Sequence, residues 1–337
     1  MKFWFKRTVY TSKKANQIID SISRDEIRSI AVLRHAALGD MVLTRCFLIE
    51  LKKAFPNAII TLSITSNYTR GTPEDLVDRV HIVYGSDKKD ISLREKINNF
   101  KELGEHDLLF DLAATNRSFK TCLLNKAKLK FGFPYRKFQS RLFYDISVPR
   151  SDLSFEVDDM LSMLHAIGIK TAYPHDFGMP GVALVRERPY VIYFTGSADL
   201  NRCWPQERYS ALVEQMSQRH PGYDHLVLDG LHDYEKADVV LGSIQKRENL
   251  GAIAADNIEE TISLLKGAAM VVSNDTGIRN LAITCNTTTI GIFFASHPYR
   301  YWPRHHGHDV VIPESAGYPS VDETLAVCDK AISDQSE

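Results

Sequence analysis

Short apolar runs alternate with amphipathic segments of helix length along most of this chain, and this alternation restricts its fold more than any other feature. Such a rhythm is typical of parallel β/α units. The first series of expected strands covers residues 29–34, 58–64, 79–85, 107–113 and 129–133. The second series covers 189–196, 225–230, 249–255, 269–275 and 287–294. Helices are expected over 41–54, 154–167, 205–219, 233–245, 258–267 and 276–285.

The two series are separated by a junction with prolines and glycines, "YPHDFGMPGVALVRERP" at 173–189. A chain of 337 residues also exceeds the length of about 250 at which one core stops growing. We therefore predict an N-terminal extension over 1–28 and two Rossmann-like α/β domains, over 29–180 and 181–337. In such folds ligands bind beyond the carboxyl ends of the strands, so the residues that follow strands are the candidates for function.

The net charge of −1 conceals an asymmetry between the two halves of the chain. Residues 1–150 contain 27 Lys and Arg against 16 Asp and Glu, whereas residues 151–337 contain 14 against 26. A basic N-terminal half indicates an anionic partner, although charges spread over solvated faces would give the same sum.

The chain is expected to be a cytosolic protein with reduced thiols. Its five cysteines are far apart and form no CxxC pair; they are Cys46, Cys122, Cys203, Cys285 and Cys328. No apolar run reaches the roughly 18 residues that a membrane span needs. The opening "MKFWFKRTVYTSKK" lacks the features of a signal peptide. We interpret it as a mobile arm or an added helix that could touch a membrane surface.

The segment "VVSNDTGIRNLA" (271–282) places a small, hydroxyl-bearing turn between an expected strand and an expected helix. The first N–H groups of a helix lack intrahelical partners and lie at the positive end of its dipole. Gly277 allows a ligand to approach the backbone closely, and the Thr276 hydroxyl can donate a hydrogen bond, so the turn suits an anion. Alternatively, Asp275 or Thr276 is simply an N-cap, worth about 1 kcal/mol of helix stability.

Two further joints between strand and helix carry candidate residues. In "RHAALGDMVL" Asp40 opens the first expected helix, either as a cap or as a general base at the mouth of a cleft. The joint lacks GxGxxG, so a dinucleotide fingerprint is absent. In "FTGSADLNRCWPQERY" the planar fork of Arg202 is suited to a diphosphate, or Arg202 is a surface residue beside a structural Trp-Pro helix start.

Two clusters of one residue type complete the candidates. The basic segment 116–141 contains eight cations and no acid: Arg117, Lys120, Lys126, Lys128, Lys130, Arg136, Lys137 and Arg141. It indicates an anionic substrate or a charged membrane surface, and no motif supports nucleic acid. The segment 296–309 contains His297, His305, His306 and His308. No set of ligands at metal spacing completes it, so we interpret it as a loop lining the cleft.

Three segments, taken in order, carry the resemblance to a known family. They are "IAVLRHAALGDMVLTRCFLIELKKAFPNA", "TGSADLNRCWPQERY" and "VVSNDTGIRNLAITCNTTTIGIFFASHPYRYWP", and an "RS" also follows "DLAATN". Together they resemble glycosyltransferase family 9, the ADP-heptose:lipopolysaccharide heptosyltransferases, from about Ile30 to about Pro303.

The resemblance implies a GT-B architecture, in which two Rossmann-like domains with parallel sheets face each other across a cleft. It implies an inverting transfer of a heptose or related sugar from a nucleotide diphosphate, expected to be ADP-heptose, to an anionic lipopolysaccharide-type acceptor. The enzyme would be cytoplasmic, with a possible peripheral contact at the inner membrane. No metal or other cofactor is expected, since no DxD sequence is present.

The resemblance also assigns roles to individual residues. Asp40 matches the family's general base. The expected donor-binding residues are Gly196, Ser197, Arg202, Glu235, Asp275, Thr276, Gly277 and Asn280, with Asp233 as an alternative to Glu235. The expected acceptor-binding residues are Arg34, Gly39, Arg117 and Lys120. Backbone groups around 254–257 would contact the nucleotide base.

The sequence departs from the family pattern at three places. Asn280 stands where a histidine is common, Arg202 replaces a lysine, and "FFASHP" replaces an aromatic-Gly-Pro loop. These departures leave two alternatives: an altered member that binds a nucleotide sugar without turnover, and a transferase with a different donor. A nicotinamide-dependent oxidoreductase on two Rossmann domains is a third class, which the missing GxGxxG disfavours.

Overall fold

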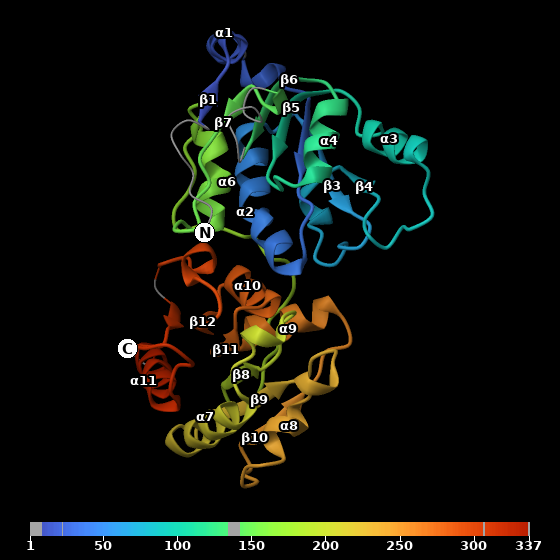
Figure 1. Cartoon of the computed structure of the whole chain (residues 1–337). Helices are drawn as coiled ribbons and strands as arrows, with labels where there is room; N and C mark the ends of the chain where they lie inside the picture. Colours follow the sequence, from blue (N-terminus) through green and yellow to red (C-terminus); the bar gives the residue numbers. More distant parts are fainter. Residues whose placement is uncertain (1–8, 22, 134–141, 306, 336–337) are drawn as a thin grey trace. The chain divides into compact units, whose positions relative to one another are not determined.

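Two doubly wound α/β units, each built on a mainly parallel sheet, form the framework of the chain (Figure 1). We describe them from a computed structural model that covers residues 9–21, 23–133, 142–305 and 307–335. The units are Met1–Phe177 and Gly178–Glu337, so the division falls inside the junction at 173–189. The described part of the expected extension, from residue 9 onward, belongs to the first unit.

The first unit contains a seven-stranded sheet with the order β1-β7-β6-β5-β2-β3-β4. Its strands are β1 (Tyr10–Thr11), β2 (Ser29–Leu33), β3 (Ile59–Thr65), β4 (Arg79–Val83), β5 (His106–Asp111), β6 (Ala127–Gly132) and β7 (Ile146–Ser147). All neighbours are parallel except β1, which pairs antiparallel with β7 at the edge. The chain winds outward from β2 through β3 to β4 and then returns to β5, so its direction reverses between β2 and β5.

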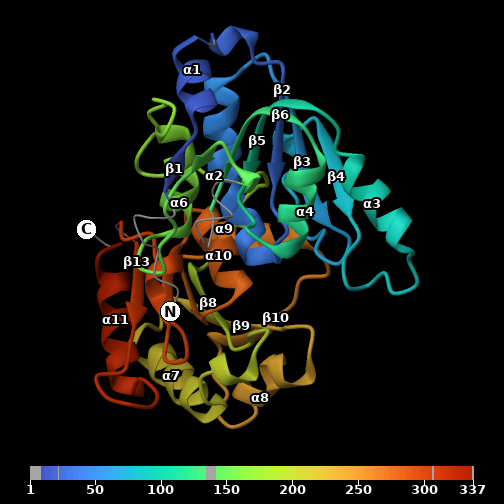
Figure 2. The ribbon, with the colours of Figure 1, turned by 45° about the horizontal axis from the view of Figure 1, so that its top comes forward.

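Helices cover both faces of the first sheet. They are α1 (Lys13–Ser21), α2 (Leu38–Ala54), α3 (Leu93–Lys101), α4 (Asn116–Leu124) and α6 (Glu156–His165), with short 3-10 turns at Arg24–Glu26 and Glu74–Leu76. Right-handed crossovers place α2 on one face and α3 and α4 on the other. Figure 2 shows this arrangement, with α6 beside α2 and α3 beside α4.

The second unit contains six parallel strands in the order β10-β9-β8-β11-β12-β13. They are β8 (Tyr190–Phe194), β9 (Asp224–Leu228), β10 (Leu250–Ile253), β11 (Met270–Asn274), β12 (Thr288–Ile292) and β13 (His308–Val311). β8 and β11 lie side by side at the centre, and the winding direction reverses between them. In open α/β sheets of this kind, ligands bind beyond the carboxyl ends of the two strands between which the winding reverses.

The helices of the second unit also lie on both faces of their sheet. They are α7 (Gln206–Arg219), α8 (Ala237–Leu241), α9 (Ile258–Gly267), α10 (Gly277–Thr284) and α11 (Val321–Ser333), with 3-10 turns at Leu200–Arg202, Asp233–Glu235 and Pro298–Tyr301. α7 packs against α11 on one face, and α9 packs against α10. The core between the α7 face and the sheet contains Trp204, Tyr209 and Met216, each at most 1% exposed.

The expected strands and helices are present, and the structure adds elements that the apolar pattern did not predict. The added strands β1, β7 and β13 are short or lie at a sheet edge, where little apolar surface is needed. The added helices are α1, α3, α4 and α11. The expected helix over 233–245 is a 3-10 turn followed by the short α8. Residues 1–8 of the expected arm lie outside the described residues.

All five cysteines are free thiols, and four of them are buried in the two cores. Within the described ranges, the helices are too short or too polar for any of them to cross a bilayer.

Candidate active site

The carboxyl ends of β2 and β5 bring the first group of predicted site residues together in unit 1. Asp40 lies in the first turn of α2, just beyond β2, and its side chain is 30% exposed. The N-cap of α2 is Ala37, so Asp40 does not cap the helix. Instead its carboxylate Oδ1 accepts a hydrogen bond from Nη2 of Arg34 over 3.1 Å. Gly39 is buried beside it in the same turn.

Arg34 lies inside the unit, with 1% of its surface exposed. Nη1 donates to the Leu112 carbonyl over 2.8 Å and to Glu156 Oε1 over 2.9 Å. Nε and Nη2 donate to the Asp40 carbonyl over 3.3 and 3.1 Å. The expected acceptor-binding side chain is thus directed into the protein, where it joins the ends of β2 and β5.

A chain of buried hydrogen bonds leads from β4 to the loop before α2. The His81 Nε2–H donates to the Asn99 carbonyl over 2.9 Å, so Nδ1 of His81 accepts from the Ser63 hydroxyl at 2.9 Å. The Ser63 oxygen lies 3.3 Å from Nε2 of His35, on the loop that leads to Asp40. Burial, with a smaller contribution from His81 and Arg117, lowers the pKa of His35 to about 3. This loop therefore contributes no titrating histidine at neutral pH.

Arg117 and Lys120 open onto a cavity of about 700 Å³ between α3, α4 and the segment after β4. The cationic lining consists of Lys88, Lys89, Lys96, Arg117 and Lys120, and no Asp or Glu is among the described residues that line the cavity. The apolar lining includes Leu93, Ile97, Phe100, Leu123 and Leu124. Leu93 and Leu123 are 73% and 53% exposed. The cavity suits a ligand that carries both negative charge and apolar surface.

The rest of the basic segment behaves differently from Arg117 and Lys120. Lys126 pairs with Glu105 at 2.9 Å and Lys128 with Asp107 at 2.7 Å. Nζ of Lys130 donates to the Cys122 carbonyl over 2.6 Å. Acids from earlier in the chain therefore neutralise part of a segment that contains none itself. Arg136, Lys137 and Arg141 lie outside the described residues.

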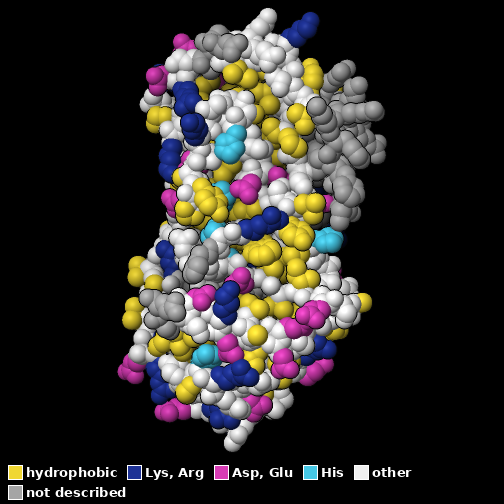
Figure 3. All heavy atoms as spheres, turned by 90° about the vertical axis from the view of Figure 1, so that its left-hand side faces the viewer, with side chains coloured by type: hydrophobic (Ala, Val, Ile, Leu, Met, Phe, Trp, Pro, Cys, Tyr) yellow, Lys and Arg dark blue, Asp and Glu magenta, His cyan; other side chains and the backbone are white. Residues whose placement is uncertain are grey.

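Acidic residues of unit 2 do not form a comparable patch on the face that Figure 3 shows. Lys and Arg are interspersed with Asp and Glu over this unit, at the bottom of the view. On this face, the negative charges of the second half of the chain are therefore spread among positive ones and do not form one acidic patch.

The second group of predicted residues gathers in unit 2 where β8 and β11 end. Thr276 is the N-cap of α10, yet its side chain makes no capping hydrogen bond. Thr276 and Gly277 are half-buried. The hydroxyl of Ser197, just after β8, donates to the Asp275 carbonyl over 3.3 Å. The turn therefore combines a helix N-terminus, an uncommitted hydroxyl and a short loop from the neighbouring strand, which suits an anion.

Arg202 reaches this turn from the loop after β8. Its Nη1 donates to Oδ2 of Asp275 over 3.2 Å, and its side chain is 43% exposed. The same Asp275 oxygen accepts from the Ser296 hydroxyl over 2.7 Å. The guanidinium is thus held at the turn while much of it stays open to solvent.

Asn274, which was not among the predicted site residues, supports the same turn from the end of β11. Its amide oxygen accepts from the Trp204 backbone N–H over 2.9 Å, and its amide nitrogen donates to the Thr195 carbonyl over 2.7 Å. Trp204 is in turn fixed by a hydrogen bond from its indole to the Pro319 carbonyl over 3.0 Å. One buried side chain therefore fixes the loop that carries Arg202. The Asn before the Asp-Thr-Gly turn was the available signal.

Glu235 lies beside the same loop, whereas its alternative Asp233 is exposed. Glu235 is 6% exposed, and Oε2 accepts from the His232 backbone N–H over 3.1 Å. A Cβ added at Gly196 or at Gly230 would collide with its side chain. Two glycines, each just beyond the end of a strand, thus make room for this one carboxylate.

The first turn of α10 also holds a buried cation and Asn280. Asn280 is 5% exposed, so it lies behind the turn. Arg279 is 1% exposed, stacks over the Phe293 ring at 5.1 Å and donates to the Tyr301 carbonyl over 2.6 Å. A Cβ at Gly291 would collide with its guanidinium. Arg279 therefore ties the helix to the segment that follows β12.

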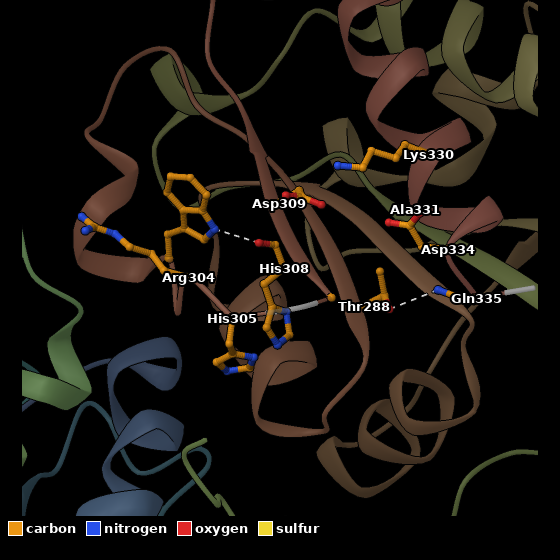
Figure 4. Close-up of a pocket in the computed structure, with 11 residues that line it drawn as sticks. Thr288, Arg304, His305, His308, Asp309, Lys330, Ala331, Asp334 and Gln335 are labelled. Atoms are coloured by element: carbon orange, nitrogen blue, oxygen red, sulfur yellow. Dashed lines mark hydrogen bonds between the residues drawn. The ribbon is translucent and has the colours of Figure 1, made fainter. Parts of the chain in front are cut away.

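The histidine-rich segment separates into two parts. Ser296, at its start, contacts the turn through Asp275, whereas His305 and His308 line a different cavity of about 340 Å³ near the amino ends of β12 and β13 (Figure 4). The Thr289 hydroxyl and His308 Nδ1 are 2.9 Å apart, and burial lowers the pKa of His308 to about 3. No group of three potential metal ligands occurs among the described side chains; His306 lies outside them.

Comparisons with known proteins identify the class. The model of glycosyltransferase family 9 (heptosyltransferase) matches residues 101–326. Lipopolysaccharide heptosyltransferase 1 of Campylobacter coli is 24% identical over 313 residues, which span 80% of this chain and 85% of that protein. Among solved structures, a family 9 glycosyltransferase from Veillonella parvula is similar, with a TM-score of 0.76, 17% identity and coverage of 91% of this chain and 98% of the other.

A second solved structure is an Escherichia coli heptosyltransferase with ADP-2-deoxy-2-fluoro heptose. It has a TM-score of 0.70 and 16% identity, covering 92% of this chain and all of the other. Both neighbours share the GT-B fold expected from the sequence. The chain is therefore a glycosyltransferase of the GT-B class. It belongs to glycosyltransferase family 9, the heptosyltransferase family, and the interpretation as a nicotinamide-dependent oxidoreductase is wrong.

Proposed function

We propose that this glycosyltransferase moves a heptose, or a closely related sugar, from ADP-heptose to an anionic lipopolysaccharide-type acceptor with inversion at the anomeric carbon. The observation that carries the proposal is the placement of the candidate residues. A carboxylate lies where the winding of unit 1 reverses, a cationic cavity lies between α3, α4 and the segment after β4 of the same unit, and an anion-binding turn lies where the winding of unit 2 reverses.

The donor is assigned to unit 2. Its diphosphate would lie at the N-terminus of α10, where Thr276 and Gly277 offer donors and Arg202 offers a planar fork, while Ser197 would support the turn through its bond to the Asp275 carbonyl. Glu235 would accept from the ribose hydroxyls, and backbone groups around 254–257 would contact the base. The structural neighbour from Escherichia coli, solved with an analogue of ADP-heptose, supports this choice of donor.

The acceptor is assigned to unit 1. An anionic group of the acceptor would bind Arg117 and Lys120 at the cavity, and its reacting hydroxyl would lie at Asp40. Asp40 takes the hydroxyl proton as the oxygen forms a bond to the anomeric carbon, and the bond from that carbon to the diphosphate breaks on the opposite face. A positioned base contributes about 10²–10⁴ in rate.

The departing ADP gains negative charge as the bond breaks. Arg202, Thr276 and the N–H groups at the start of α10 would stabilise that charge, and fixed donors of this kind act without reorganising. We therefore propose that the transfer proceeds without a metal ion.

We also propose that the enzyme works at the cytoplasmic face of the inner membrane. The mixture of lysines with exposed leucines on α3 and α4 suits the headgroups and acyl chains of an anionic glycolipid. Cosedimentation with vesicles of anionic lipid, and not with vesicles of neutral lipid, is the expected result. Equal binding to both kinds of vesicle would contradict this part of the proposal.

The central experiment measures ADP release from ADP-heptose with a heptose-free lipopolysaccharide core as acceptor. Asp40→Ala and Asp40→Asn should each lower turnover at least about tenfold, while the stabilisation of the protein by ADP stays unchanged. NMR of the product should show the inverted anomer. Full activity in both variants would exclude Asp40 as the base.

The same experiment separates the alternatives. Donor binding without turnover on a range of acceptors would favour the altered member that Asn280 allows. Turnover with another nucleotide sugar in place of ADP-heptose would reassign the donor while leaving the class unchanged.

A further inference from the structure

The interactions of Arg34 account for all of its hydrogen-bonding capacity. A guanidinium has five N–H donors. Two point to the Asp40 carbonyl, one to the Asp40 carboxylate, one to the Leu112 carbonyl and one to Glu156. With all five donors used inside unit 1 and 1% of the residue exposed, no donor is left for an acceptor sugar.

The charges around Arg34 alternate. Glu156, the first residue of α6, is fully buried and accepts from Arg34 over 2.9 Å. Arg150 bonds both oxygens of the same carboxylate, over 2.6 and 3.2 Å, and its guanidinium lies over the Phe133 ring at 5.2 Å. Four side chains thus form a spatial series of alternating charge from the partly exposed edge into the core: Asp40, Arg34, Glu156 and Arg150.

Such an arrangement is costly to bury and is retained only when each charge has its partner. Only the outer member, Asp40, reaches the surface. The inner three fix where its carboxylate stands, since Arg34 bonds both the backbone and the side chain of Asp40. The order of the winding makes this possible, because the residue after β5 supplies the Leu112 carbonyl.

We propose that Arg34 and Glu156 are positioning residues that hold Asp40 in its working orientation, and that Arg34 does not bind the acceptor. This inference rests on the proposed role of Asp40 as the base. It replaces the contact expected for Arg34 with a structural role that acts through another residue.

The test compares Arg34→Met and Glu156→Gln with a matched control, Arg28→Met. Arg28 is exposed at the other end of the same strand, so its loss should leave the kinetics unchanged. Arg34→Met should lower kcat at least about tenfold with KM for either substrate changed less than about twofold. Glu156→Gln keeps the shape and an acceptor oxygen, and should lower kcat by a smaller factor. Arg34→Lys, which keeps one charge, should recover part of the loss.

A double variant gives the readout that a general loss of structure would not. In the Asp40→Asn background, Arg34→Met should lower kcat by less than a further factor of about two, because both changes remove the same function, that of the positioned base. The inference would be overturned if the loss of kcat in the double variant equalled the product of the two single losses. It would also be overturned if Arg34→Met raised only KM for the acceptor. If Arg34→Met fails to fold, Arg34→Lys and Glu156→Gln take its place in the same cycle.

Failure of the inference and failure of the proposed function give different results. An active Asp40→Asn variant removes the base itself. An inactive Asp40→Asn beside a fully active, folded Arg34→Met leaves the base in place and removes only the positioning role.

Discussion

Arg202 and Asp275 form an ion pair of 3.2 Å between the loop after β8 and the turn after β11. The guanidinium is therefore held at the turn by a carboxylate, and in the proposed donor complex that carboxylate and the diphosphate would share one cation. Because a guanidinium has five N–H donors, Arg202 has enough of them to bind both anions.

We predict that Arg202→Ala weakens ADP binding by about tenfold, because the diphosphate loses a charge-assisted partner and Asp275 is left uncompensated beside it. Arg202→Lys should lose less, because it keeps the charge without the fork. Titration calorimetry with ADP measures both. Arg219→Ala removes an arginine of similar exposure at the far side of the unit, and should bind ADP normally.

Gly196→Ala should disturb the donor site through Glu235. The added methyl has no space, because it would collide with the buried Glu235 carboxylate. Overpacking of this kind costs about 1–3 kcal/mol, seen as a lower free energy of unfolding or weaker ADP binding. Gly222→Ala is the matched control, since nothing lies within 4 Å of the added Cβ. If both variants had the same free energy of unfolding and the same affinity for ADP, the close contact between Gly196 and Glu235 would be unimportant.

Removal of the cavity cations should affect the acceptor alone. Arg117→Ala combined with Lys120→Ala is expected to raise KM for the anionic acceptor about tenfold, with less effect at high salt because screening already weakens the attraction. KM for the donor should stay constant. Lys126→Ala, in the same basic segment but paired with Glu105, should change neither value. An equal effect of Lys126→Ala would indicate diffuse attraction instead of a site.

Stability should fall in mild acid because of buried histidines. The pKa of His308 in the folded protein is about 3, below its ordinary value of 6.5. Between these values the unfolded chain binds more protons, so the free energy of unfolding falls as pH falls, by up to about 1.4 kcal/mol per pH unit for this group. Urea unfolding at pH 6.5 and pH 5 should show a shallower fall for His308→Asn. An unchanged slope would contradict the assignment.

The sequence predicts the sheet cores and the strand-to-helix joints well, because their buried apolar runs have a clear length and period. It is less informative for α3, whose pattern is polar, although Ser92 and Glu95 form a capping box that could have marked its start. α11 begins with the same motif at Ser320 and Glu323.

The partnerships within the site could not be predicted in the same way. The carboxylate of Asp275 meets Arg202 and the hydroxyl of Ser296 only because of the strand order, which local patterns do not specify. Burial decided the case of Arg34. A cation after a strand is equally suited to a ligand or to an internal carboxylate, and only Glu156, far along the chain, distinguishes the two.

The guanidinium of Arg279 fills the space that a side chain at position 291 would occupy, and this limits which residues can replace either one. A side chain at position 291 is excluded while the guanidinium occupies that volume, and a smaller residue at 279 would leave a void beside Phe293. The two positions must therefore change together, in evolution or in the laboratory. Grafting β12 from a relative into this chain should therefore transplant residue 279 together with residue 291.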